Sequence, residues 1–215
     1  MRFRSKLTLA ALAMFGVAAC GDSTSGKMGS VSVMLTDAPG DVLQAVVTIS
    51  SVYLQGGEGD DPNTGGRVML REDDFTVDLL TLAASTADLV EGVEVPEGTY
   101  RQLRFVVTGA FVEVENSDGT TSIYASSPTY EELPDGAVVV GDLQMPSLAQ
   151  SGLKVTLPGN AVSVGEEGVV LLVDFDVAQS FGKLAGNSNK WVMHPVIHAT
   201  LVEGEEAAAS VARSR

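Results

Sequence analysis

Residues 168–177, Gly-Val-Val-Leu-Leu-Val-Asp-Phe-Asp-Val, decide the class of fold. Successive side chains of a β-strand point to opposite faces, so this stretch presents two faces that are both apolar over most of their length. A strand that is apolar on both faces is typical of the middle of a sheet. We therefore predict a central, largely buried strand that ends in two carboxylates. One face carries Val170, Leu172, Asp174 and Asp176, and the other carries Val169, Leu171, Val173, Phe175 and Val177.

Other runs of strand length, rich in β-branched and aromatic residues, recur along the chain. Turn signals such as Ala-Pro-Gly at 38–40 and Pro-Asp-Gly at 134–136 separate them. Only 79–91 has a pattern that a helix could use. Many short strands with regular turns favour an antiparallel sandwich or barrel, and we expect an all-β, antiparallel β-sandwich with at most one short helix. The other predicted strands are 30–36, 45–54, 67–70, 75–79, 99–108, 110–115, 121–125, 137–143, 152–157 and 191–202.

The charge of the chain limits its partners. It has 13 basic and 28 acidic residues in 215, a formal net charge of −15. Three of the basic residues and none of the acidic ones lie in the first 19 residues, so the remainder carries −18. Such a surface repels nucleic acid and anionic lipid headgroups, and we expect neither as a direct partner. Hydrophobic residues make up 45% of the chain, which is enough for one real core.

The N-terminal segment resembles the export signal of a bacterial lipoprotein. Residues 1–6 are basic, residues 7–19 are an apolar run too short to span a bilayer, and Val17-Ala18-Ala19-Cys20 is similar to a lipobox. We expect a signal peptide over 1–19 and lipidation of Cys20, the single cysteine. An ordinary signal peptide with a chance cysteine is the alternative. The predicted location is the cell envelope, at the outer membrane if the host is Gram-negative.

The same reasoning divides the rest of the chain. Residues 20–28 are small and polar, which predicts a lipidated cysteine followed by a flexible tether. The β-sandwich domain is expected over 29–202, and a disordered tail over 203–215. With its only cysteine in the tether, the predicted domain contains no disulfide and no thiolate metal site.

Six groups of short motifs occur in a fixed order between about 28 and 202. Together they resemble the bacterial lipoprotein family called domain of unknown function 4382. The resemblance implies a secreted or surface-tethered β-sandwich without assigned chemistry. Pro96-Glu97-Gly98-Thr99-Tyr100 is also similar to the strand entry of transthyretin-like sandwiches, so the expected sandwich is transthyretin- or immunoglobulin-like. The motifs are Leu35–Asp41, Val77–Leu82, Gly98–Arg104, Pro146-Ser147 with Ser151–Lys154, Val173–Asp176 with Ser180, and His194–Ile197.

Asp174 and Asp176 are the leading candidates for a functional site, because a strand places them on one face about 7 Å apart. Buried carboxylates require a cation or strong hydrogen-bond donors. One interpretation is a structural network, in which Arg104, Ser180 or backbone amides satisfy them. The other is a hard cation such as calcium, which takes only oxygen ligands. We favour the structural network, since pairs of aspartate with arginine or with backbone amides are commoner in proteins than ligand sites. Further carboxylates available to either arrangement are Asp37, Asp41 and Asp78.

Three weaker patterns are better explained by structure than by ligand binding. His194 and His198 would lie about 13 Å apart on a strand, too far for one metal ion, and Pro195 argues against a helix. The loop 56–66 is faintly similar to a calcium loop, but a solvated hairpin loop is favoured. The aromatic side chains that could stack on sugars are expected to pack in the core instead. They are Trp191, Tyr53, Tyr100, Tyr124 and Tyr130.

No catalytic motif is present, so we expect a protein that is not an enzyme and needs no cofactor. The predicted function is a lipid-anchored, non-catalytic binding or structural role at the cell envelope. The sequence does not identify the ligand, and a carbohydrate or a protein is a candidate. The alternative is a calcium-dependent carbohydrate-binding or adhesion module. A hydrolase with a carboxylate-based site is the third hypothesis. A binding module should expose an aromatic patch beside a groove, and an enzyme should have a pocket lined by convergent polar groups.

Overall fold

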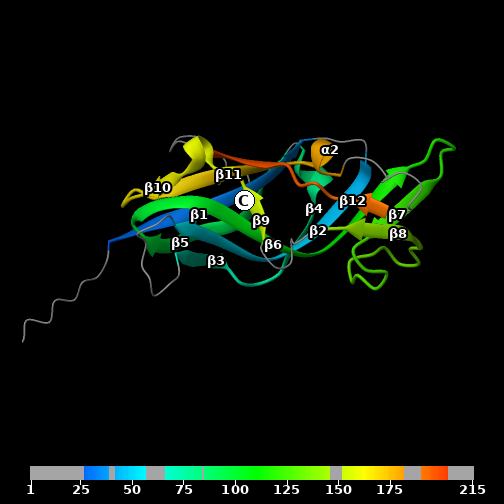
Figure 1. The fold of residues 1–215 in the computed structure, drawn as a ribbon, viewed down its shortest axis with the longest axis horizontal. Coiled ribbons are helices and arrows are strands. Elements are labelled where there is room, and N and C mark those ends of the chain that lie inside the picture. Colours follow the sequence, from blue (N-terminus) through cyan, green and yellow to red (C-terminus); the bar gives the residue numbers. More distant parts are fainter. Residues whose placement is uncertain are drawn as a thin grey trace, which may run out of the picture.

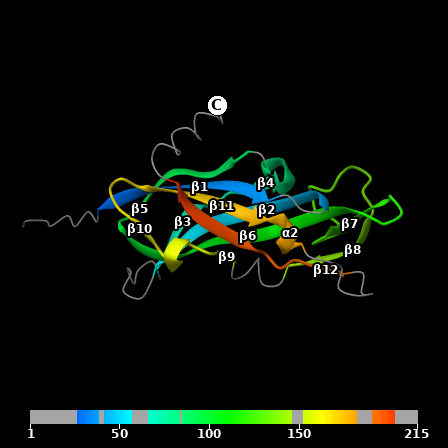
Figure 2. The ribbon, with the colours of Figure 1, turned by 90° about the horizontal axis from the view of Figure 1, so that it is seen from above.

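The structure is a computed structural model that describes residues 27–38, 42–56, 66–83, 85–145, 152–181 and 190–202. Two β-sheets face each other (Figures 1 and 2), which confirms the all-β sandwich predicted from the sequence. The smaller sheet has the strand order β13 (Ile197–Val202), β11 (Val169–Asp176), β1 (Met28–Ala38), β5 (Ala87–Pro96). The larger has the order β12 (Lys190–Val192), β8 (Val139–Gln144), β7 (Thr121–Ala125), β6 (Gly98–Glu115), β2 (Val42–Gly56), β3 (Arg67–Arg71), with β4 (Phe75–Asp78) on β2 and β9 (Leu153–Val155) and β10 (Val162–Val164) on β6.

The strand pairing is mixed rather than purely antiparallel. β1 pairs with β11 in parallel, and β8 pairs in parallel with both β7 and β12. Parallel neighbours need a long connection between them, and β1 and β11 are separated by most of the domain. The remaining ladders are antiparallel, as the turn signals predict.

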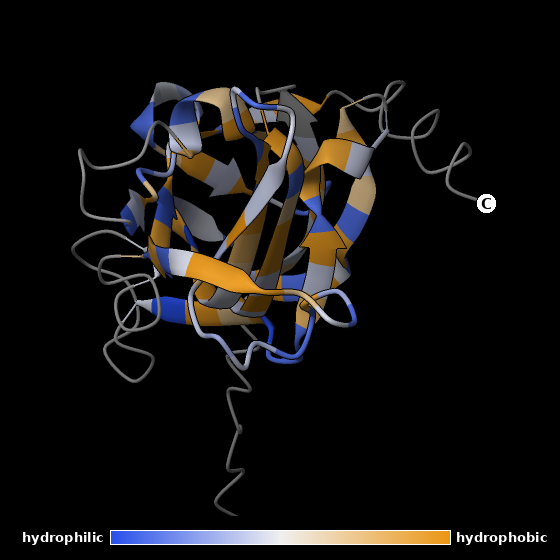
Figure 3. Cartoon of the chain, turned by 90° about the vertical axis from the view of Figure 1, so that its right-hand side faces the viewer, coloured by the Kyte–Doolittle hydropathy of each residue, from blue (hydrophilic) through white to orange (hydrophobic). Residues whose placement is uncertain are grey.

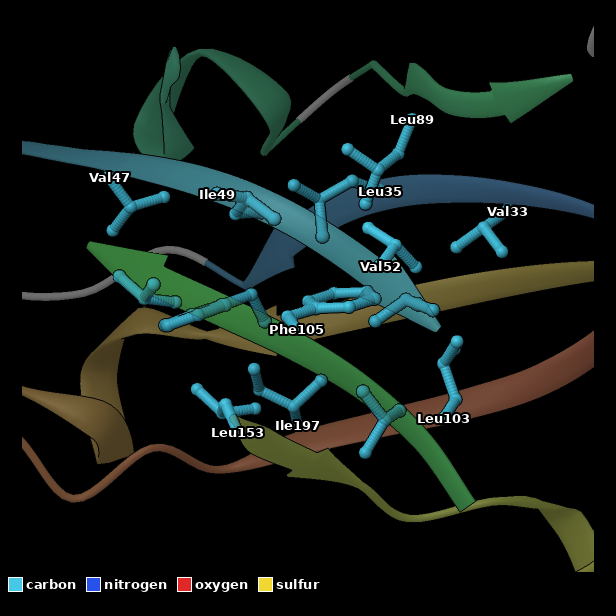
Figure 4. Close-up of a cluster of buried hydrophobic side chains, with 14 of the residues drawn as sticks. Val33, Leu35, Val47, Ile49, Val52, Leu89, Leu103, Phe105, Leu153 and Ile197 are labelled. Atoms are coloured by element: carbon cyan, nitrogen blue, oxygen red, sulfur yellow. The ribbon is translucent and has the colours of Figure 1, made fainter. Parts of the chain in front are cut away.

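The core lies between the two sheets. On β11 the side chains of Leu171, Val173 and Phe175 are at most 1% exposed, while the alternate residues are half-buried. Figure 4 shows the corresponding side chains of both sheets meeting, including Leu35 of β1 and Phe105 of β6. The view in Figure 3, towards the end that carries β7 and β8, shows hydrophobic and hydrophilic residues alternating along the strands. Burial of these apolar side chains is the main driving force for the fold.

Helical structure is brief, as expected. The segment 79–91 forms only a 3-10 turn, η1 (Leu79–Leu82), before β5 begins at Ala87. The other short elements are η2 (Pro158–Asn160) and the four-residue helix α2 (Val177–Ser180). Among the described residues, no helix has the length and apolar character needed to cross a membrane.

A second, smaller apolar cluster lies on the outer face of the larger sheet. The connection from β7 to β8 folds back over this face, and Tyr130 packs against Phe111 with the ring centroids 6.3 Å apart. The Tyr130 hydroxyl also forms a 2.6 Å hydrogen bond with the Thr48 hydroxyl. Gly109 lies directly under the Tyr130 ring, where an added Cβ would come within 2.2 Å of a ring carbon.

Candidate functional site

Asp174 and Asp176 lie at the end of β11, on the outer face of the four-stranded sheet. In the register of this sheet, Asp174 is flanked by Thr36 of β1 and by His198 of β13. Both carboxylates are partly buried. They share the outward face that the alternation along the strand predicts, opposite the core-facing Val173 and Phe175.

Asp176 is engaged in local structure. Its Oδ1 accepts a 2.9 Å hydrogen bond from the backbone N–H of Gln179, and its Oδ2 accepts one from the Gln179 side-chain amide. The first bond caps the N-terminus of α2, which is a common role for aspartate at a strand-to-helix junction. Asp176 also donates its backbone N–H to the carbonyl of Val196 (3.0 Å). Both oxygens of this carboxylate therefore accept hydrogen bonds that stabilise the local structure.

Asp174 is in a different environment. Its Oδ1 is shielded from solvent and has no hydrogen-bond partner among the described residues. Burial raises the pKa of the Asp174 carboxyl above its ordinary value, the negative charge of Asp176 raises it further, and His198 lowers it by a smaller amount. The ionised form of Asp174 is thus disfavoured where it stands.

Ser180, expected as a donor to these carboxylates, binds a different segment. It is fully buried, and its Oγ accepts a 2.9 Å hydrogen bond from the backbone N–H of Val196. The Ser180 carbonyl accepts another from the backbone N–H of His194 (2.7 Å). These two hydrogen bonds hold the segment between β12 and β13 against α2.

The structure does not bring Arg104 to Asp174 and Asp176. Arg104 lies on the outward face of β6 in the other sheet, and the core separates the two outward faces. Its Nε and Nη2 donate to the Gln102 side-chain oxygen (2.9 and 2.8 Å), and its Nη1 donates to the Gly152 carbonyl (3.1 Å). The alternation that buries Leu103 and Phe105 directs Arg104 away from the core.

The other predicted carboxylates are only partly described. Asp78 caps η1, since its Oδ1 accepts from the backbone N–H groups of Leu80 and Ala45 at 3.2 Å each. The backbone of Asp37 pairs in register with Phe175 of β11. Asp41, the lipidation residue Cys20, the loop residues 57–65 and the tail 203–215 lie outside the described residues.

Within the described part of the chain, no group of three or more His, Cys, Asp or Glu side chains is arranged to hold a metal ion. His194 and His198 are both exposed. His194 lies in the non-strand segment 193–196 between β12 and β13, whereas His198 lies within β13. Calcium at Asp174 and Asp176 remains a prediction, because Asp41 is one of its proposed ligands.

The aromatic residues mostly belong to the interior. Four of the five proposed sugar-stacking side chains are buried, and Tyr130 is half-buried. Trp191 packs on Tyr124 with the ring centroids 5.1 Å apart, and its indole N–H donates to the carbonyl of Phe181. Among the described residues, no aromatic side chain is fully exposed, and Phe75 and Tyr130 are half-buried.

An open groove of about 730 Å³ was not foreseen from the sequence. It lies where β6, β7 and the end of β8 meet. No local pattern indicates it, because the residues of the groove come from segments that only the fold brings together. It is lined by Thr108, Ser126, Ser127, Asp142, Leu143, Gln144 and Met145.

Comparison with known proteins gives the family but no chemistry. A family model described as "Domain of unknown function (DUF4382)" matches residues 28–195. The chain belongs to this family. No curated protein and no solved structure matches it. The DUF4382 match runs from β1 to the link before β13, so it includes Asp174, Asp176 and Ser180, whereas His198 lies beyond it.

Proposed function

We propose that this DUF4382 protein is lipid-anchored in the cell envelope and that its β-sandwich has a non-catalytic binding or structural role. One observation carries the anchor: the single cysteine, Cys20, directly follows a basic segment and an apolar run of thirteen residues that ends in Val17-Ala18-Ala19. Several acyl chains on one residue give stable attachment, whereas one chain gives only marginal binding. In a Gram-negative host we place the protein at the outer membrane.

The geometry of the acidic strand end supports a non-catalytic role. Glycoside hydrolysis by a carboxylate pair requires two groups that face the substrate from either side of the bond. Here both oxygens of Asp176 accept hydrogen bonds from Gln179, and Asp78 caps η1. Among the described carboxylates of the candidate site, this leaves Asp174, and a single carboxylate does not make such a pair.

Lipid attachment is tested by detergent-phase partitioning of the full chain produced in a bacterium that exports and processes lipoproteins. The Cys20→Ser variant lacks the acyl acceptor, so it should move to the aqueous phase, while wild type stays in the detergent phase. Ser25→Ala in the tether is the matched control and should behave as wild type. If the Cys20→Ser variant partitions into detergent as wild type does, the anchor proposal is wrong.

A second candidate function is calcium-dependent adhesion. It is favoured by the shielded, unpartnered Oδ1 of Asp174 beside Asp176, since a cation would satisfy that oxygen. Thermal melts in calcium chloride and sodium chloride at matched ionic strength separate it from the first proposal.

A further inference from the structure

The open groove in the larger sheet continues the position that β7 occupies between β6 and β8. Because β7 pairs with both of these strands, they stand two strand spacings apart, about 10 Å, on either side of it. β7 ends at Ala125, beside Phe111 of β6 and Asp142 of β8, and both neighbours continue past that point (Figure 1). The groove beyond the end of β7 is therefore about one strand wide.

Both walls of the groove are strand edges. Residues 106–109 of β6 lie beside β2, and among the described residues no strand pairs with their other side. Residues 143 and 144 of β8 pair with β12, and again no described strand lies on their other side. Backbone groups of a strand point alternately to its two edges, so N–H and C=O groups of both walls face the groove. We call the space between residues 106–109 and 143–145 the strand slot.

The two ends of the strand slot are closed by the sheet itself. At one end the backbone N–H of Ser126 donates to the Ala110 carbonyl (2.9 Å), and the Ser126 Oγ accepts from the Ala110 N–H (3.0 Å). At the other end β9 pairs with β6, with Leu153 opposite Phe105. The length that remains corresponds to residues 106–109, so the slot suits a short stretch of extended chain.

We infer that the strand slot binds an extended peptide segment of a partner protein, which adds to the sheet antiparallel to β6 and parallel to β8, as β7 does. Hydrogen bonds from the two walls would give this peptide its affinity, and its alternate side chains would give specificity. The inference names a partner class for the binding role proposed above, and it does not depend on the anchor.

The side chains around the strand slot indicate which peptide sequences fit it. Alternate residues of the bound strand would point to opposite faces of the sheet. Those on the inner face would meet Leu143, which is 3% exposed, and the half-buried Met145, so they should be apolar. Those on the outer face would meet the exposed Thr108, Asp142 and Gln144, so they should be polar. The net charge of −15 disfavours acidic peptides.

A sugar fits the strand slot less well than a peptide. None of the described residues that line the groove is aromatic, so they offer no surface on which a sugar ring could stack. Two of the hydroxyl groups are already bonded to the protein. Ser127 Oγ lies 3.0 Å from the Thr129 hydroxyl and accepts from the Thr129 N–H, while Ser126 Oγ binds Ala110.

The test selects seven-residue random peptides, displayed on phage, on the full chain in a non-ionic detergent. Enriched sequences should alternate apolar with polar or basic residues and lack proline at their centre. Calorimetry with a synthetic copy of an enriched peptide then compares two variants. Thr108→Trp fills the slot from the β6 wall and should weaken binding at least about tenfold, whereas Thr121→Trp changes an exposed threonine of β7 outside the groove and should stay within about twofold of wild type.

Methylation of the peptide backbone separates the strand slot from an ordinary sheet edge. A strand held between two walls donates its N–H groups alternately to each of them, so methylation of any central amide should weaken binding about tenfold, the scale of one lost hydrogen bond. A peptide added to a single edge would lose affinity only at every second amide.

Several outcomes would overturn the inference. They are no enriched peptide, unchanged binding by Thr108→Trp, an equal loss in Thr121→Trp, or a loss at every second amide only. Binding of a neutral dextran oligomer that Thr108→Trp abolishes, without an enriched peptide, would assign the slot to a sugar instead. If Thr108→Trp melts below wild type, Gln144→Trp on the opposite wall takes its place and should weaken binding by a similar factor. Detergent partitioning of Cys20→Ser is independent of these outcomes, so failure of the slot and failure of the anchor can be told apart.

Discussion

At the scale of single residues, the two carboxylates of β11 differ although they are two positions apart. Asp176 is satisfied by Gln179, while Asp174 has a shielded oxygen without a partner. Their separation on one face follows from the alternation of a strand, so it could be predicted from the sequence. The groups that surround each carboxylate could not be predicted from the sequence. His198, for example, is brought beside Asp174 only by the register of β13 on β11.

Replacing Asp174 by Asn should stabilise the protein at pH 7 by up to about 1 kcal/mol, since it removes a disfavoured, half-buried charge. A folded-state pKa above the ordinary 3.8 means that wild type is relatively more stable at low pH and loses stability as the pH rises through the folded-state pKa. The advantage of the Asn variant should therefore vanish below about pH 3.8. Denaturant unfolding of both proteins from pH 3 to 8 measures this difference. A loss of several kcal/mol at pH 7 would instead reveal a cation partner.

The cap on α2 gives a second prediction. Asp176→Ala removes both acceptors of the Gln179 bonds and should lower the free energy of unfolding by about 0.5–2 kcal/mol. Asp176→Asn is the matched control, because it keeps an acceptor for the backbone N–H of Gln179 and should cost less. In both variants the pKa of Asp174, followed by NMR titration, should fall towards its ordinary value, since the neighbouring charge is gone. An unchanged Asp174 pKa would mean that Asp176 does not influence it.

At the scale of elements, the sequence pattern predicted most strands, including the short β3, β4 and β7, but it missed β5 and β10. The sequence suggested a helix up to 91, yet β5 begins at Ala87 because Leu89 and Val95 must face the core. The apolar run 191–202 was expected as one strand, but it divides into β12 and β13 around Pro195, which has no N–H for a ladder. β10 has only three residues, which is too short for alternation along the sequence to identify a strand.

The parallel pairing of strands could not be predicted either, because it depends on contacts between segments that are distant in the sequence.

Gly109 shows why a glycine does not always end a strand. We expected strands on either side of it, and the structure has one strand, β6, running through. Gly109→Ala should cost about 1–3 kcal/mol, since the added methyl meets the Tyr130 ring and would displace it from its packing against Phe111. Gly98→Ala, in the same strand with no atom within 4 Å, should stay within about 0.5 kcal/mol of wild type.

The Tyr130 contact can be isolated with a double-mutant cycle. If the cost of Gly109→Ala comes from the ring, combining it with Tyr130→Ala should give a loss smaller than the sum of the two single losses. Chemical denaturation of the four proteins supplies the cycle. Additive losses would mean that the glycine is needed for the backbone of β6 and not for the ring.

At the scale of the whole molecule, the excess of acidic residues decides how ions act on stability. A net charge of −15 repels itself in the compact state, and dissolved salt screens that repulsion. The melting temperature should therefore rise with sodium chloride up to about physiological ionic strength. This screening depends on ionic strength and requires no site.

Calcium provides the deciding comparison. At matched ionic strength, calcium chloride should raise the melting temperature no more than sodium chloride does, because Asp176 and Asp78 already accept hydrogen bonds from protein donors. A true site would add a stabilisation that grows with the logarithm of free calcium above its dissociation constant. Thermal melts of wild type and Asp174→Asn in both salts make the measurement. A calcium-specific rise in wild type that Asp174→Asn abolishes would establish the calcium-dependent alternative and replace the structural interpretation of the strand end.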